Sequence, residues 1–472
     1  MPAYDRLYID GAWVPSHHTG SLTVVDPTTE EPLACVPDAT ERDVDAAVRG
    51  ARAAADGWAA TAVAERAGFL HAIAAELGRR AEALARLITQ DVGTPLSFSR
   101  AVQVTLPVNS FHHAARTALE YPFERQQGPS RLLREPYGVV AAITPWNYPV
   151  HQAAAKVAYA LAAGNTVVLK PSEVAPLSVW ELTDVIASAG LPPGVFNLVS
   201  GSGPQAGEAL AGHPGVDVVS LTGSTRTGRR VSALAARTLK KVALELGGKS
   251  PAVMLADADP ARVVPAVMAS AFLNNGQTCS ALTRLIVPRP ALAEVEELAR
   301  HTASGWAPGD PKDERTRLGP LASAVQLQRV RRHITDARAA GAVLVTGGED
   351  PPADLPRGFF VQPTVLSRVS PDMALHHDEV FGPVLAIEAY DTEEEALRIA
   401  NDTVYGLAAA VWSADEHRAF AMARALRAGQ VQVNGAPFDP NAPFGGYKQS
   451  GNGREGGTAG LEEFLETKAV QS

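Results

Sequence analysis

The chain has 472 residues, and its 46% hydrophobic and 20% charged residues are ordinary proportions for a soluble globular protein. This length predicts roughly three domains with large buried cores. The formal net charge of -9 provides no basic face for nucleic acid. The sequence has no signal-like opening and no apolar run as long as a membrane span, so we expect a cytoplasmic protein without nucleic-acid or membrane partners.

Amphipathic helices are expected first, over residues 40–87. The segment that starts at Thr40 has a capping residue and an acidic first turn, and residues 64–88 keep a helical apolar stripe. We expect these helices to cover the outside of the protein.

Short apolar runs alternate with helical segments from Gly138 to about residue 248. Continuous apolar strands joined by repeated helical crossovers predict a parallel sheet with helices on both faces. The predicted strands are residues 138–144, 166–170, 195–199, 216–223 and 240–246.

A second alternation of strands and helices begins at Pro251 and predicts another α/β domain. Residues 119–138 lack an apolar core stripe, and the end of the chain has an extended pattern. Neither segment can bury itself alone. We therefore expect both to pair between subunits of a homodimer or homotetramer.

Glycine-rich turns follow two successive strands of the first sheet. One contains Gly203 and Gly207, the other begins at Gly223, and Glu173 follows the strand before them. Each turn alone is as well explained by an ordinary strand-to-helix connection. Together they favour a bound dinucleotide, since such turns let the backbone approach a phosphate at a helix N-terminus. A carboxylate at Glu173 suits a ribose diol and repels a 2′-phosphate, which favours NAD over NADP.

Cys279 stands among small and polar residues, as a nucleophile would, although a lone cysteine is more commonly a small core residue. The other cysteine, Cys35, is interpreted as a packing residue, and two cysteines are too few for a disulfide framework, which favours a reducing compartment. Asn147, bracketed by prolines, offers an uncharged amide donor for an oxyanion, or caps its own loop. Glu245 could activate water or pair with a lysine.

Nine segments contain short motifs: PWNYP, VVLKPSE, GSGPQAG, LTGSTRTG, LELGGKSP, GQTCSALTR, EVFGPV, YGL and PFGGYKQSGNGRE. Together, over nearly the whole chain and in this order, they resemble the aldehyde dehydrogenase family. The resemblance implies an NAD-binding Rossmann-type domain over residues 1–118 and 138–248, and an α/β catalytic domain over 249–458. Residues 119–137 and 459–472 would form a small β oligomerisation element.

The resemblance also implies catalytic roles. Cys279 is the nucleophile, Asn147 and the Cys279 backbone N–H form the oxyanion hole, and Glu245 is the base that activates water to hydrolyse a thioester. The product is a carboxylic acid. Lys156 and Glu455 match a buried ion pair that relays protons from the base.

Further residues are implied to contact the cofactor and the substrate, and no metal is implied. The expected NAD-binding residues are Thr144, Trp146, Lys170, Ser172, Glu173, Gly203, Gly207, Thr222, Gly223, Ser224, Leu246, Gln326, Glu379 and Phe381. The expected substrate residues are Tyr148, His151, Gln152, Ala155, Thr278, Ser280, Phe438 and Phe444.

Ala155 departs from the family pattern, because many members have a bulky aromatic residue there. The small residue widens the tunnel and removes one wall of the aromatic cage that a trimethylammonium aldehyde would need. No arginine or lysine is placed in the tunnel, which disfavours a carboxylate-bearing semialdehyde. We expect a medium to bulky, mostly apolar aldehyde, and we interpret His151 as a hydrogen-bonded structural histidine.

Three other functions fit parts of this pattern. A CoA-acylating dehydrogenase gains nothing from a hydrolytic base such as Glu245. A catalytically silent dinucleotide-binding or lens-type structural protein has no need to keep Cys279, Asn147 and Glu245 together. A thiol esterase leaves the glycine turns unexplained.

Overall fold

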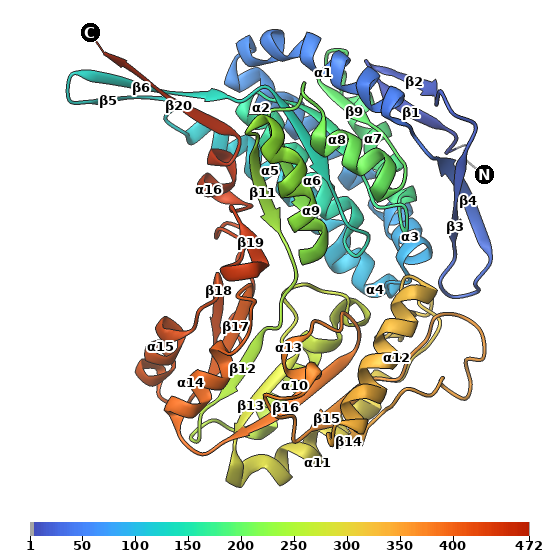
Figure 1. Ribbon diagram of the computed structural model, residues 1–472, viewed down its shortest axis with the longest axis vertical. Helices are drawn as coiled ribbons and strands as arrows, with labels where there is room; N and C mark the ends of the chain where they lie inside the picture. Colours follow the sequence, from blue (N-terminus) through green and yellow to red (C-terminus); the bar gives the residue numbers. More distant parts are fainter. Residues whose placement is uncertain (1–3, 472) are drawn as a thin grey trace.

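The computed structural model describes residues 4–471 and contains two large sheets and a projecting arm (Figure 1). The first sheet has the strand order β19-β11-β10-β7-β8-β9-β1-β2. Its strands are β1 (Arg6–Ile9), β2 (Ala12–Pro15), β7 (Val139–Ile143), β8 (Thr166–Lys170), β9 (Phe196–Leu198), β10 (Val218–Thr222), β11 (Lys241–Glu245) and β19 (Gly451–Asn452).

The five central strands of this sheet, β7 to β11, are parallel and confirm the expected pattern. They form because their apolar residues are buried on both faces. The chain runs from β7 outward to β8 and β9, then returns to β10 on the other side of β7. The strand order therefore reverses beside β7. In open α/β sheets, ligands commonly bind at such a reversal, at the carboxyl ends of the strands.

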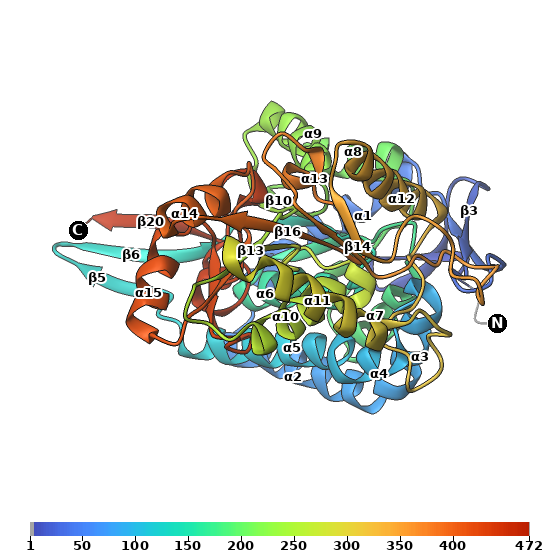
Figure 2. The ribbon, with the colours of Figure 1, turned by 90° about the horizontal axis from the view of Figure 1, so that it is seen from below.

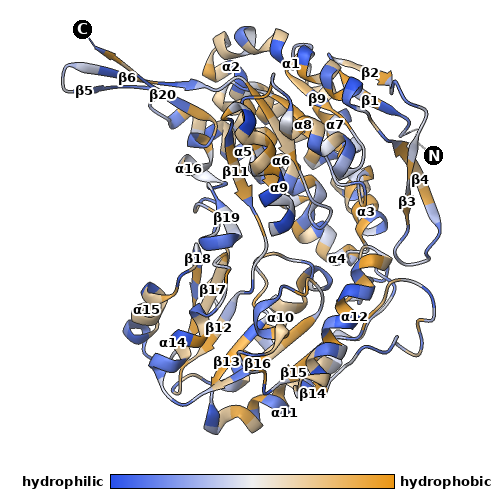
Figure 3. Ribbon diagram, in the orientation of Figure 1, coloured by the Kyte–Doolittle hydropathy of each residue, from blue (hydrophilic) through white to orange (hydrophobic). Residues whose placement is uncertain are grey.

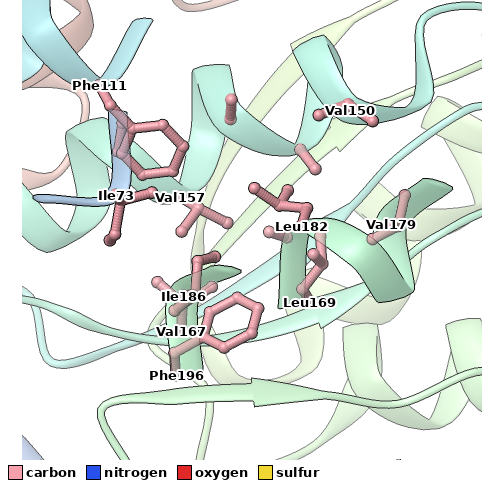
Figure 4. Close-up of a cluster of buried hydrophobic side chains, with 14 of the residues drawn as sticks. Ile73, Phe111, Val150, Val157, Val167, Leu169, Val179, Leu182, Ile186 and Phe196 are labelled. Atoms are coloured by element: carbon pink, nitrogen blue, oxygen red, sulfur yellow. The ribbon is translucent and has the colours of Figure 1, made fainter. Parts of the chain in front are cut away.

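Helices cover both faces of the first sheet. Figure 4 shows one of its two cores, in which side chains of α2, α5, α6 and α7 pack on β8 and β9. The helices are α1 (Glu41–Ala60), α2 (Val63–Arg79), α3 (Ala81–Val92), α5 (Thr105–Glu120), α6 (Pro149–Ala163), α7 (Leu177–Ser188), α8 (Glu208–Gly212) and α9 (Thr225–Ala235), with short turns α4 (Leu96–Phe98) and η1 (Ser99–Gln103) before α5.

The second sheet has the order β14-β15-β16-β13-β12-β17-β18 and is parallel except for β14. Its apolar strands lie between helices, and Figure 3 shows their hydrophobic character. The strands are β12 (Pro251–Met254), β13 (Arg284–Pro288), β14 (Val343–Thr346), β15 (Thr364–Ser367), β16 (Val384–Tyr390), β17 (Ala408–Trp412) and β18 (Gln430–Val433). The helices are α10 (Pro260–Phe272), α11 (Leu292–Ala303), α12 (Ala324–Ala339), α13 (Ala374–His377), α14 (Glu393–Asn401) and α15 (Glu416–Ala425).

The arm consists of β5 (Glu124–Gln127), β6 (Ser130–Pro136) and β20 (Leu465–Gln471), which follows α16 (Gly457–Glu462). Figures 1 and 2 both show it extending away from the body. Within this chain β20 pairs with β6 along its whole length, and the expected pairing between subunits stays a prediction. Residues 119 and 120 are helical rather than extended, because α5 continues to Glu120.

A hairpin of β3 (Ser21–Val25) and β4 (Pro32–Pro37) lies outside both large sheets. Within residues 4–471, no helix combines the length and apolar character needed to cross a membrane. The expected division of the chain into domains stays a prediction.

Candidate active site

Cys279 lies in a loop whose shape depends on two asparagines. Helix α10 ends at Phe272, and Asn274 and Asn275 then adopt positive φ angles of 51° and 61°. Asparagine tolerates this left-handed region better than most residues. The Asn275 side chain donates to the carbonyls of Gly93 and Pro320 at 3.0 and 2.8 Å, which fixes the turn before the thiol.

Two glycines let other backbone segments approach this loop. A Cβ at Gly276 would collide with the backbone of Gly382 and Pro383. A Cβ at Gly248 would lie 2.5 Å from the Cys279 carbonyl oxygen. The loop of Cys279 is therefore packed backbone to backbone against the linker between the two sheets and against the segment after α13.

Asn147 is buried directly beside this loop rather than capping its own turn. Its side-chain amide donates to the backbone carbonyl of Gln277 at 2.9 Å. Its own backbone carbonyl accepts from the side chains of Gln103 and Asn274, each at 2.9 Å. A primary amide has two N–H groups, so one remains for a ligand.

Glu245 ends β11, and both of its carboxylate oxygens are buried without a hydrogen-bond partner among residues 4–471. Burial raises its pKa well above the ordinary value, and the nearby Glu455 adds to this effect. A pocket of about 10 Å³ lies beside it, lined also by Ala155, Arg454 and Glu455. That is about the space one water molecule needs.

The surroundings of Cys279 oppose ionisation of its thiol. Burial raises its pKa, and the carboxylates of Glu379, Glu245 and Glu455 raise it further, while the Ser280 backbone N–H lowers it. A thiolate is the reactive species, so a base or a nearby positive charge must assist its formation.

Lys156 and Glu455 form a buried ion pair, with 2.5 Å between Nζ and Oε1. The lysine comes from α6 and is 1% exposed. The backbone of Glu455 exchanges two hydrogen bonds with that of Phe444. The expected pair is thus present and links α6 to the chain that follows β18.

Most of the expected cofactor residues lie just after the carboxyl ends of β7 to β10. Lys170 Nζ lies 3.3 Å from the partly exposed Glu173 carboxylate, which also accepts from the Gly203 N–H at 3.4 Å. The buried hydroxyls of Thr144 and Thr222 have no hydrogen-bond partner among the described residues. These groups are available to a polar ligand.

The turn after β10 opens α9, and its residues hold the helix N-terminus in place. Ser224 caps α9 by accepting from the Thr227 N–H at 3.2 Å. Four other expected cofactor residues make local contacts, and their role toward the cofactor stays a prediction. Gly207 faces the Lys170 stem, Gly223 donates to the Glu245 carbonyl, Leu246 packs against Gly228, and Ser172 accepts from the Val174 N–H.

Glu379 and Phe381 lie on a loop that Gln326 holds. The Gln326 amide donates to the carbonyls of Val380 and Phe381 at 3.0 and 2.7 Å. Burial raises the pKa of Glu379 to about 7, and its carboxylate accepts from the Gly248 N–H. The Phe381 ring meets the Trp146 ring edge to face, with centroids 5.4 Å apart. Gln326 therefore positions this loop, since its amide hydrogens are already in use.

A cavity of about 290 Å³ opens at Cys279 between α5, α6, β18 and the segment 438–456. All eight expected substrate residues line it, and no lysine or arginine occurs among its lining residues. The Tyr148 hydroxyl lies 2.9 Å from the Thr278 hydroxyl, and the Phe438 and Phe444 rings are 6.4 Å apart. Ala155 lines both this cavity and the small pocket beside Glu245.

Of the two expectations for His151, the structure favours the substrate residue over the hydrogen-bonded structural histidine. Its Nδ1 atom is buried and has no hydrogen-bond partner among the described residues. The residue lines the cavity.

A model of the aldehyde dehydrogenase family matches residues 13–470. The chain belongs to the aldehyde dehydrogenase family. A Pseudomonas relative named 3-succinoylsemialdehyde-pyridine dehydrogenase is 47% identical over 100% of this chain and 99% of its own. Putative aldehyde dehydrogenases of Staphylococcus aureus are 41% identical, with the same coverage.

Solved aldehyde dehydrogenases share this fold. Aldehyde dehydrogenase C of Pseudomonas syringae, crystallised as a cysteine-to-alanine mutant with NAD+ and octanal, has a TM-score of 0.99 at 48% identity. The match covers 100% of this chain and 97% of that one. Betaine aldehyde dehydrogenase of Staphylococcus aureus, solved with NAD+, has a TM-score of 0.97 at 36% identity, with coverage of 99% and 94%.

Residues of η1 and α5 in this aldehyde dehydrogenase also line the substrate cavity, and they were not predicted from the sequence. Asn109, Ser110 and His113 on α5 recur at helical spacing, and this polar set on a partly apolar helix was the available signal. Gln103 and Asn274, which hold the Asn147 backbone, carried no such signal because their contacts are long-range.

Proposed function

We propose that this aldehyde dehydrogenase oxidises medium to bulky, mostly apolar aldehydes to carboxylic acids with NAD. The observation that carries the proposal is the cavity of about 290 Å³ at Cys279, with its largely apolar lining and without lysine or arginine. A cavity of this volume accommodates a small-molecule substrate. The relative crystallised with octanal and the relative named for a pyridine-bearing semialdehyde support an aldehyde of this size.

Covalent catalysis by Cys279 explains the arrangement of donors around it. The thiolate sulfur bonds to the aldehyde carbon, and the carbonyl electrons move to oxygen as an alkoxide. The free N–H of the Asn147 amide and the Cys279 backbone N–H stabilise this oxyanion, and loss of one such donor costs about 3 to 4 kcal/mol. Re-formation of the carbonyl expels a hydride and leaves a thioester.

Glu245 then serves as the base for hydrolysis. Its unpartnered carboxylate removes a proton from water, the water oxygen bonds to the thioester carbon, and the Cys279 thiolate leaves. The raised pKa of Glu245 makes it an effective proton acceptor once it is ionised. Lys156 and Glu455 lie beside the base and provide a route for the proton.

The groups at the strand ends fit NAD. The unpartnered hydroxyls of Thr144 and Thr222 and the α9 N-terminus suit a pyrophosphate and its neighbouring groups. Glu173 suits a ribose diol and repels a 2′-phosphate, so we propose NAD over NADP. When bound, NAD supplies the hydride acceptor. Relatives crystallised with NAD+ support this assignment.

We also propose an oligomeric state and a cellular location for this protein. The arm, whose outer strands β5 and β20 each leave one edge unpaired within the described chain, supports a homodimer or homotetramer. The low number of cysteines and their separation support a cytoplasmic location.

Product analysis separates this function from its principal rival, CoA-dependent acylation. A panel of alkanals and arylaldehydes is ranked by kcat/KM for NADH formation, with and without CoA. The proposal requires free carboxylic acid in both cases and a preference for aldehydes larger than acetaldehyde. Formation of an acyl-CoA as the main product would contradict it.

A further inference from the structure

Two polar atoms in the substrate cavity have no partner. His151 Nδ1 and Gln152 Oε1 are both buried and form no hydrogen bond with the described residues. Both residues belong to the first turn of α6 and line the cavity. A buried polar atom without a partner costs about 1 to 3 kcal/mol, so a ligand that satisfies it gains a corresponding advantage.

His151 and Gln152 lie close in sequence to residues of the proposed active site. Asn147, the proposed oxyanion donor, lies in the turn that precedes α6, two residues before the helix begins at Pro149. His151 and Ala155 are four residues apart and share one face of α6. His151 and Gln152 therefore line the same cavity as Cys279 and Ala155.

Both groups are uncharged at neutral pH. Burial lowers the pKa of His151 to about 4, against a smaller opposing effect of Glu455, so the ring carries one N–H and one lone pair. Gln152 is an amide with both acceptor and donor atoms. Such a pair recognises a neutral hydrogen-bonding group and gives no countercharge to a carboxylate or an ammonium group.

We propose that His151 and Gln152 determine specificity for aldehydes whose apolar body carries an uncharged hydrogen-bonding group, such as a hydroxyl, a carbonyl or a ring nitrogen. This inference rests on the proposed aldehyde oxidation and narrows its substrate class. A plain hydrocarbon chain leaves both polar atoms buried and unsatisfied. A site built to bond a polar group discriminates against the analogue that lacks it.

The test compares isosteric aldehydes. One pair is 3-(pyridin-3-yl)propanal and 3-phenylpropanal, and the other is 6-hydroxyhexanal and heptanal. We expect wild-type kcat/KM to favour the polar member of at least one pair by about fivefold or more, the lower end of the cost of an unmade hydrogen bond. His151→Leu or Gln152→Met should bring that ratio close to one, chiefly through KM. His151→Asn, which keeps a hydrogen-bonding group, should retain part of the preference for the polar aldehyde.

His113→Leu is the matched control, since His113 lines another wall of the same cavity and the same ring is removed. It should preserve the preference. A wild-type ratio of one or below in both pairs, or a preference that neither His151→Leu nor Gln152→Met reduces, overturns the inference while leaving the oxidation of heptanal intact. Absence of NADH formation with all four aldehydes overturns the proposed function as well.

Discussion

Lys156 Nζ lies 2.5 Å from Glu455 Oε1, and Glu455 lines both the substrate cavity and the small pocket beside Glu245. One ion pair therefore connects the proposed base with the wall of the substrate site. The two charges act on Glu245 in opposite directions, since Glu455 raises its pKa and Lys156 lowers it. The pair thus sets how readily the base ionises.

Breaking this pair should destabilise the fold. Lys156→Met leaves the Glu455 carboxylate without its partner, and we expect a loss of about 3 to 5 kcal/mol in the free energy of unfolding, measured with urea. Lys156→Met combined with Glu455→Met should lose clearly less than the sum of the single variants. Strict additivity would contradict the coupling. The exposed pair Arg289 and Asp391 is the control, and its removal should cost less than about 1 kcal/mol.

Glu245→Gln should slow thioester hydrolysis more than hydride transfer. General base catalysis typically contributes about 10²- to 10⁴-fold, so steady-state turnover should fall by that order. Stopped-flow measurement should show a burst of about one NADH molecule per active site, followed by slow turnover. Glu297→Gln, at an exposed position on α11, should behave as wild type. Unchanged steady-state turnover without a burst would rule out Glu245 as the base.

Alkylation of Cys279 should accelerate steeply with pH. Because burial and nearby carboxylates raise the pKa of the thiol, the reactive thiolate is scarce at pH 7 and increases as pH rises. Cys35, interpreted from the sequence as a packing residue, is exposed, so the experiment uses a Cys35→Ala background. There iodoacetamide should react about tenfold faster for each pH unit from 7 to 9. Glu379→Gln removes the largest charge effect, so it lowers this pKa and speeds the reaction. A rate that levels off as the pH approaches 9 would show a thiol whose pKa is not raised.

Filling the space at Ala155 should narrow the substrate range. Ala155→Phe places a ring in the cavity, and we expect kcat/KM to fall at least tenfold for an aryl or branched aldehyde. Acetaldehyde oxidation in the same variant is the control, because that substrate does not reach the added ring. An equal loss with both aldehydes would indicate general damage to the site.

Much of the architecture was predictable because local patterns determine it. The strands β7, β8 and β10 are continuous apolar runs between helices, and such runs specify a buried parallel sheet. The candidate nucleophile, oxyanion donor and base were found because their motifs are local. Each lies in a short segment whose neighbours already suggest its chemistry.

Long-range contacts could not be predicted in the same way. Nothing in the pattern of residues 465–471 shows that β20 pairs with β6 of its own chain, since exposed polar strands carry no preference for one partner. The unpartnered state of His151 is likewise invisible in sequence. It depends on which atoms of α5 and of residues 438–456 approach the ring.

Covalent catalysis by Cys279 is tested by aldehyde-dependent NADH formation in Cys279→Ala, measured together with NAD binding by calorimetry. NADH formation should be abolished while the Kd for NAD stays within about threefold of wild type, because the cofactor groups at the ends of β7 to β10 are untouched. NADH formation at the wild-type rate by this variant would contradict covalent catalysis by Cys279.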